Sequence, residues 1–124
     1  MAEEALKTLV WMGDSKKRLV EEFPGDVRQE VGHALYLAQC GDVYSSAHRM
    51  QGFNAVEVVS DFDGDTFRAV YTTKFEDAVY VLHCFQKKSK KGVATPKPDI
   101  DLIKLRLRDA ETLYKASKKH GKKN

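Results

Sequence analysis

The stretch "AVEVVSDFDGDTFRAVYTTKFEDAVYVLHCFQ", residues Ala55 to Gln86, decides the fold of this chain. It holds three runs rich in β-branched and aromatic residues, which are typical of strands, at residues 55–62, 66–75 and 78–86. Only the turn-prone residues 63–65 separate the first two runs, and only Glu76 and Asp77 separate the last two. Because such short connections join neighbouring antiparallel strands, the stretch predicts a three-stranded meander.

The segments around this meander predict an α+β domain. We expect a strand at residues 7–13, helices at residues 15–23 and 24–40, turns at residues 42–53, and a final helix from residue 98. Pro24 ends the first helix and also suits the first turn of the second, where its missing N–H would have been unpaired anyway. The order β-α-α-β-β-β-α predicts a small antiparallel sheet with helices packed on one face, so that the other face is partly open.

The size and composition of the chain limit what it can be. Its 124 residues fit one domain, residues 1–124, in which the basic residues 117–124 are expected to form a frayed tail. It contains neither an apolar run of membrane-spanning length nor the basic-then-apolar start of a signal peptide, so we expect a cytoplasmic protein. Cys40 and Cys84 form no disulfide framework, and the histidine and cysteine spacing matches no zinc pattern; we expect no metal and no cofactor.

Charge is distributed unevenly along the sequence. Residues 83–124 contain thirteen lysines and arginines against four acidic residues, a net charge of +9. Since the whole chain carries +3, residues 1–82 carry −6. A segregated positive charge of this kind favours a polyanionic partner, with nucleic acid the first candidate. The tail alone can equally be a solvated basic end, so the internal cluster at residues 87–91 is the stronger signal.

Arg68 is the first candidate site residue. Strand alternation places it in the middle of the predicted central strand, on one face with Val70, Thr72 and Lys74. An unpaired guanidinium is very costly to bury, so this position requires a partner, an opening or a function. Two interpretations remain open: Arg68 binds phosphate through its planar fork, or it forms a structural ion pair with Glu57 or Asp61 on the neighbouring strand.

The end of the last predicted strand supplies the other candidates. Lys87 and Lys88 point in opposite directions, so only one of them can approach a given phosphate. Crowded ammonium groups disfavour their charged forms, so one lysine could carry a proton; the alternative is electrostatic steering towards RNA without chemistry. His83 alternates with Val79, Val81 and Phe85 on an apolar face, where a histidine is either a core residue or a general base.

Three segments resemble those of a known group of toxins. "FRAVY" (Phe67 to Tyr71) resembles the tyrosine-arginine-valine-X-tyrosine strand of the RelE/ParE superfamily. "VLHCFQKKSKKGVATPKPDIDLIKLR" (Val81 to Arg106) resembles the Leu-His-X-Phe-X-Lys-Lys segment of its phage-derived, HigB-like branch, including the threonine-proline stretch and the helix that follow. "AVEVV" (Ala55 to Val59) is similar to the Glu-Leu-Arg strand of that branch. The resemblance covers roughly residues 7–115 and implies a RelE-like fold.

This resemblance implies the toxin of a type II toxin–antitoxin pair, a metal-independent endoribonuclease that cuts mRNA in the ribosome. It implies a cognate antitoxin, usually of helix-turn-helix type, and the ribosome and mRNA as further partners. Arg68 matches the arginine that stabilises the scissile phosphate, Lys87 and Lys88 match the basic pair, of which Lys88 is favoured for catalysis, and His83 matches the preceding histidine. To RNA backbone contact we assign Lys90, Lys91, Lys97 and Arg49, the last of which precedes the second predicted strand beside His48.

Two other functions fit the same fold. Val59 stands where the branch has arginine, and Gly92, Val93 and Ala94 stand where some RelE enzymes have a tyrosine. Both departures favour a non-enzymatic regulator that binds RNA or a partner protein. A gyrase-targeting toxin of the ParE type is the third hypothesis, against which the lysines at the strand end argue.

Overall fold

The computed structural model describes residues 5–87 and 94–123. Its elements, in chain order, are β1 (Thr8–Trp11), α1 (Ser15–Glu22), α2 (Gly25–Gln39), β2 (Ala47–Arg49), β3 (Val56–Phe62), β4 (Asp65–Thr72), β5 (Ala78–Lys87) and α3 (Lys97–Lys123). The predicted α+β class, the two N-terminal helices and the three-stranded meander are confirmed. α3 continues to Lys123 and includes most of the segment for which we predicted a frayed tail.

The sheet is mixed, whereas we predicted an antiparallel one. Its five strands lie in the order β1-β5-β4-β3-β2, and β2 to β5 are antiparallel to their neighbours. β1 pairs in parallel with β5, with Thr8 opposite Ala78. Two helices and three strands separate β1 from β5 in the chain, and so long a connection can return the chain in the same direction, which a tight turn cannot. β2 lies where we expected only turns.

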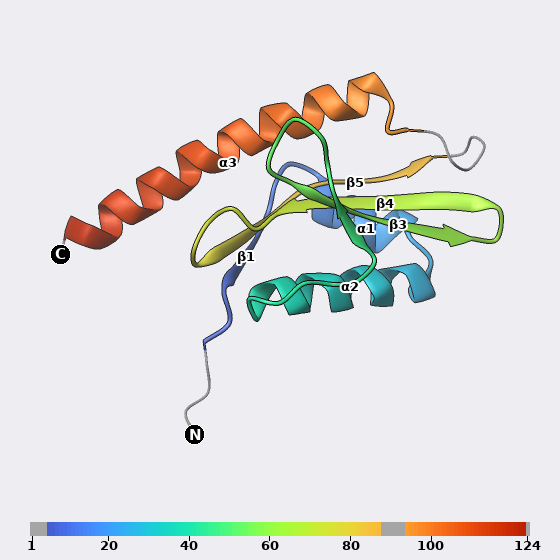
Figure 1. Cartoon of the computed structure of the whole chain (residues 1–124), viewed down its shortest axis with the longest axis horizontal. Coiled ribbons are helices and arrows are strands. Elements are labelled where there is room, and N and C mark those ends of the chain that lie inside the picture. Colours follow the sequence, from blue (N-terminus) through green and yellow to red (C-terminus); the bar gives the residue numbers. More distant parts are fainter. Residues whose placement is uncertain (1–4, 88–93, 124) are drawn as a thin grey trace.

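Helices cover both faces of the sheet, so the prediction of helices on one face is wrong (Figure 1). On one face α1, α2 and the connection between them pack Leu19, Val27 and Phe23 against the sheet. On the other face α3 packs Ile103, Leu107 and Ala110 against a second set of strand residues. The physical reason is that β4 and β5 are apolar on both sides, with seven buried residues in β4 and eight in β5, so neither face can be left to water.

A β-bulge interrupts the alternation of β5. Val70 of β4 lies opposite His83, but the next residue, Tyr71, lies opposite Val81, so Leu82 is the extra residue. As a result Leu82 and His83 both face α3, while Val81 and Cys84 face α1 and α2. The bulge therefore moves His83 away from the face of Val79 and Val81, where regular alternation had placed it.

Candidate functional site

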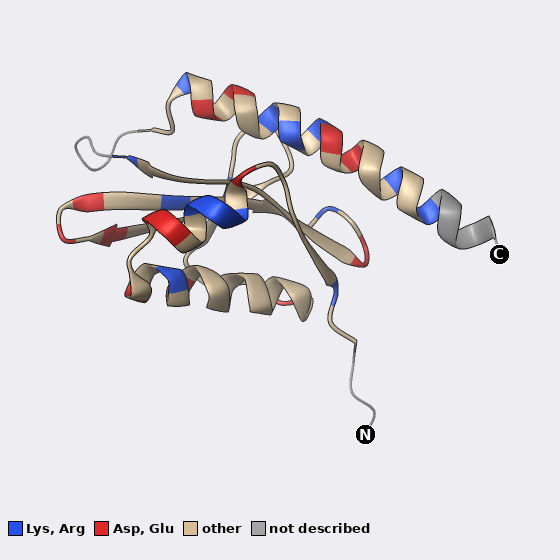
Figure 2. Cartoon of the chain, turned by 180° about the vertical axis from the view of Figure 1, so that it is seen from behind, with Lys and Arg blue, Asp and Glu red and all other residues tan. Residues whose placement is uncertain are grey.

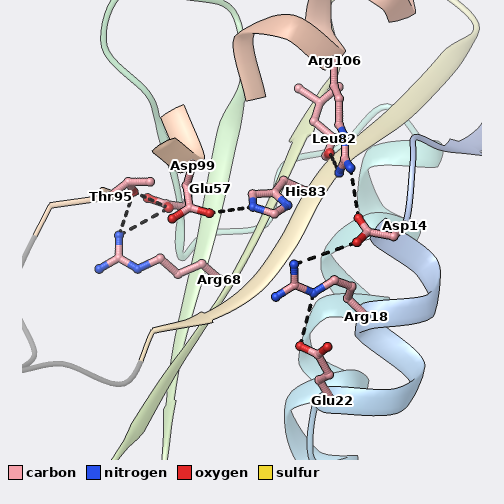
Figure 3. Close-up of polar contacts among 10 residues, drawn as sticks. All are labelled: Asp14, Arg18, Glu22, Glu57, Arg68, Leu82, His83, Thr95, Asp99 and Arg106. Atoms are coloured by element: carbon pink, nitrogen blue, oxygen red, sulfur yellow. Dashed lines mark hydrogen bonds and ion pairs between the residues drawn. The ribbon is translucent and has the colours of Figure 1, made fainter. Parts of the chain in front are cut away.

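Arg68 lies on the α3 face of the sheet and is buried (Figure 3). In β4 it stands between Val59 of β3 and Phe85 of β5. Its Nη1 lies 3.4 Å from Oε2 of Glu57, and the two side chains are only 8% and 9% exposed. Of the two interpretations of Arg68, the structure contains the ion pair with Glu57. A buried pair of this kind neutralises both charges, and loss of either partner would leave the other uncompensated.

Thr95 joins this ion pair from the segment that precedes α3. Its hydroxyl accepts a hydrogen bond from Arg68 Nη1 at 3.0 Å and donates one to Glu57 Oε2 at 2.9 Å. Arg68, Glu57 and Thr95 thus form a closed hydrogen-bonded triad, in which β3, β4 and the entry to α3 meet (Figure 3). A phosphate could bind Nη1 only by replacing the Glu57 carboxylate or the Thr95 hydroxyl.

His83 forms a second polar pair on the same face. Its Nε2 lies 2.8 Å from Oδ1 of Asp99 in the first turns of α3, and its ring stacks on Phe85 with centroids 4.5 Å apart. Burial lowers the pKa of His83, although the Asp99 carboxylate opposes this shift. The neutral imidazole is therefore the favoured form at pH 7. The side chain of His83 is 2% exposed and that of Asp99 is 27% exposed, so Asp99 is the member of the pair that reaches the surface.

Arg106 fixes α3 over this site. Its Nη1 donates to the carbonyl of Leu82, the bulge residue, at 2.9 Å, and its Nη2 donates to Asp14 Oδ1 at 3.0 Å (Figure 3). Its guanidinium also packs directly on Gly13, where a side chain would overlap it. One arginine therefore ties α3 to the bulge and to the turn between β1 and α1. Since Asp99 lies two helical turns before Arg106, this clamp also holds Asp99 against His83.

Two of the predicted lysines, Lys87 and Lys97, belong to the described part of the chain. Lys87, the last residue of β5, lies opposite Thr66 and shares the α3 face with Phe85 and Arg68, because side chains alternate along each strand. It is half-buried. Lys97 begins α3, is 83% exposed and pairs with Asp101. The structure therefore brings Arg68, Lys87 and the His83–Asp99 pair to one face of the sheet, but α3 packs on this face, so it is not the partly open face that we predicted.

Arg49 is not part of this site. Arg49 of β2 lies opposite Val56 of β3, which in turn lies opposite Tyr71 of β4. Residues paired in this way point to the same face of the sheet, here the face covered by α2. Arg49 is exposed there, on the reverse side of the sheet from Arg68. Three other predicted residues, namely Lys88, Lys90 and Lys91, lie outside the residues that the structure describes.

The basic charge of α3 is partly balanced within the fold. Lysines and acidic residues intermingle along the helix (Figure 2). Lys74 of the β4–β5 connection pairs with Glu111, and Lys118 pairs with Asp77 at 2.9 Å. Among the described residues, no three His, Cys, Asp or Glu side chains gather closely enough to hold a metal ion. In the same described part of the chain, no helix is long and apolar enough to cross a membrane.

Sequence reasoning missed part of this centre. Glu57 entered only as an alternative partner of Arg68, while Thr95 and Asp99 were not assigned to the site. The sequence did contain a sign that Asp99 and Arg106 act together. They are seven residues apart, so they lie on one side of the predicted final helix. Nothing in the sequence marked the bulge that brings His83 to Asp99.

This chain is a small α+β protein with a RelE-like arrangement of a mixed sheet and helices on both of its faces. A family model described as "Phage derived protein Gp49-like (DUF891)" matches residues 18–108, most of the chain. The chain therefore belongs to this Gp49-like family of phage-derived proteins, which is related to the RelE-like toxins of toxin–antitoxin systems. Neither the curated proteins nor the solved structures contain a significant match. The family match contains Glu57, Arg68, His83, Thr95, Asp99 and Arg106.

Proposed function

We propose that this protein is the toxin of a type II toxin–antitoxin pair and that it stops translation by cutting mRNA on the ribosome. The observation that supports this best is the common placement of Arg68, Lys87 and the His83–Asp99 pair on one face of β4 and β5. The family relationship supports the toxin role. The proposal includes a cognate antitoxin, of helix-turn-helix type, and action in the cytoplasm.

The residues of this face suit cleavage of RNA by its own 2′-hydroxyl. In that reaction the 2′ oxygen attacks phosphorus and gives its proton to a base, the bond to the 5′ oxygen breaks, and water gives a proton to the departing 5′ oxygen. Arg68 would stabilise the negative charge that grows on the phosphate oxygens, a role worth about 2.7–4 kcal/mol for one preorganised donor. Lys87 would attract and hold the neighbouring phosphate. Asp99, which contacts His83 and is the more exposed member of that pair, is the candidate proton acceptor at the surface.

The Arg68–Glu57–Thr95 triad adds a condition to this proposal. Arg68 Nη1 is engaged by a carboxylate and a hydroxyl, so a phosphate oxygen that binds this nitrogen must replace at least one of them. Thr95 belongs to the short connection before α3 and is only half-buried, so it is the partner that can leave with the smaller rearrangement. We therefore propose that the enzyme is active in a conformation in which Thr95 has moved off Arg68.

The test is controlled expression in bacteria together with purified ribosomes. Induction of the wild-type chain should arrest growth and cut translated mRNA, and Lys87→Ala and Arg68→Lys should weaken both effects. Lys17→Ala changes an exposed lysine of α1 and should remain as active as the wild type. Thermal unfolding of each variant shows whether lost activity reflects lost structure. A wild-type chain that is harmless and leaves mRNA whole overturns the enzyme proposal.

A non-enzymatic regulator is the second candidate, because the internal ion pair leaves Arg68 buried as a structural residue would be. RNA binding that weakens with salt, without cleavage on ribosomes, would select this function. Blocked DNA supercoiling with intact mRNA would instead indicate a gyrase-targeting toxin.

A further inference from the structure

A cavity of about 390 Å³ opens on the face of the sheet that α2 covers, on the reverse side from Arg68. It lies where the end of α2, the start of β1 and strands β2 to β4 meet. Its polar lining comes from Lys7, Asp42, Arg49, Tyr71 and Thr73, and its apolar lining includes Val56. This volume is in the range of small-molecule sites, which combine an apolar wall with a few polar groups.

The border of the cavity is fixed by backbone hydrogen bonds. The Lys7 amide donates to the carbonyl of Gln39 at 2.9 Å, and Nε2 of Gln39 donates to the carbonyl of Lys7 at 2.8 Å. Gly41 turns the chain at the end of α2 with a φ of +84°, which favours glycine. These hydrogen bonds tie the start of β1 to the end of α2, beside the connection 40–46 that completes the lining.

Tyr71 supplies a hydroxyl to this cavity. Its side chain lines the cavity, and only 2% of the residue is exposed. The hydroxyl is not among the described buried polar atoms that lack a hydrogen-bond partner, so it is the cavity and its charged lining that indicate a ligand. Burial raises the pKa of Tyr71 to about 12, so its hydroxyl remains a proton donor at neutral pH.

The charges around Tyr71 favour an anion. Lys7 and Arg49 supply two cations, and Asp42 supplies one carboxylate, whose Oδ1 already accepts a hydrogen bond from the Val43 amide at 3.0 Å. The last carbonyls of α2 that border the cavity accept hydrogen bonds from the amides of residues 40–42, so they are occupied as well. The Asp42 carboxylate keeps further acceptor capacity, but the donors of Lys7, Arg49 and Tyr71 outnumber this one carboxylate in the lining.

We propose that this cavity binds a carboxylate carried on a short aliphatic stem. Tyr71 and Arg49 would donate hydrogen bonds to the carboxylate, Lys7 would add positive charge, and the stem would lie against Val56 and its apolar neighbours. A free organic acid and a glutamate or aspartate side chain of a partner protein share this chemistry. The site is separate from Arg68 and goes beyond the proposed toxin activity.

Glutarate is the test ligand, and glutaramide is its neutral control of the same size. Titration of the full chain, followed by NMR, should shift the backbone amides of Ala47, Tyr71 and Thr73 with glutarate and leave them in place with glutaramide. Tyr71→Phe keeps the packed ring and removes only the hydroxyl, so its melting temperature should stay close to that of the wild type. It should weaken glutarate binding roughly tenfold, the equivalent of one hydrogen bond to a charged group. Arg49→Gln should do the same, and Lys17→Gln should change nothing.

The source of the carboxylate is decided by the peptide acetyl-Ala-Glu-Ala-amide. Tighter binding of the peptide than of glutarate indicates a side chain of a partner protein, and weaker binding indicates a free acid; both support the site. Equal shifts with glutarate and glutaramide, or unchanged glutarate binding by Tyr71→Phe, overturn it. Weaker RNA binding by Arg49→Gln with unchanged glutarate binding also overturns it, because Arg49 would then belong to an RNA surface. These experiments measure ligand binding and not toxin activity, so their outcome is independent of the proposed toxin function.

Discussion

Arg68 and Glu57 are joined diagonally across β3 and β4. Arg68 lies directly opposite Val59, and Glu57 lies directly opposite Val70, yet Arg68 Nη1 reaches Glu57 Oε2 at 3.4 Å. Diagonal neighbours on one face of a sheet are within reach of long side chains. Because Thr95 bonds both partners, this one relationship connects the stability of the sheet, the position of the segment before α3 and the availability of the guanidinium.

Removal of Arg68 alone should destabilise the fold more than removal of the whole ion pair. Arg68→Met leaves the buried Glu57 carboxylate without its cation, which we expect to lower the free energy of unfolding by about 3–5 kcal/mol. Adding Glu57→Leu to Arg68→Met removes that uncompensated charge and should restore part of the loss. Urea unfolding of the single and double variants measures both values. A double variant less stable than Arg68→Met would contradict the ion pair.

Glu57→Gln should strengthen RNA binding under the proposed function. The substitution keeps the shape of the side chain but removes the negative charge that competes with phosphate for Arg68. The Arg68–Glu57 hydrogen bond stabilises the RNA-free protein by about 1.5 kcal/mol. Its loss would therefore raise the affinity for RNA roughly tenfold. Filter binding to a short single-stranded RNA at fixed salt checks this, with Asp61→Asn on the same strand as the matched control. Unchanged or weaker binding would mean that Arg68 does not meet RNA.

His83 should make the stability of the protein depend on pH. Its pKa in the folded protein is lowered below the usual 6.5 by burial, so the unfolded chain binds a proton more readily than the folded one. The contribution of the neutral imidazole is fully present above pH 6.5 and is lost as the pH falls from 6.5 towards the lowered pKa. Urea unfolding at pH 7.5 and pH 5.5 should therefore show a decline that is smaller in His83→Gln. An equal decline in both chains would show that other groups cause it.

Gly13 should be less tolerant of a side chain than Gly41. Both have positive φ values, +54° and +84°, so Gly13→Ala and Gly41→Ala share the strain of that conformation, about 1–2 kcal/mol. Only at Gly13 would the new Cβ overlap the Arg106 guanidinium, while nothing lies within 4 Å at Gly41. Thermal unfolding should show the larger loss for Gly13→Ala. In an Arg106→Ala background the excess should disappear, since the overlapping group is gone; an excess that persists would contradict the clamp.

Local sequence determined the elements of this protein. The β-rich runs with their short connections predicted the meander, Pro24 and Gly25 divided the two N-terminal helices, and alternation placed Arg68 in mid-strand. These features depend on neighbouring residues, whose propensities and spacing are visible in the chain. The sequence also restricted the partner of Arg68 to a few acids, Glu57 among them.

Tertiary structure alone decided how these elements meet. The parallel pairing of β1 with β5, the placement of α3 on the opposite face from α1 and α2, and the bulge at Leu82 all depend on contacts between distant segments. The contact of Asp99 with His83 spans sixteen residues, and that of Thr95 with Glu57 spans thirty-eight. Such contacts form because both faces of β4 and β5 must be buried and each buried charge must find a partner, and these demands act on the whole fold.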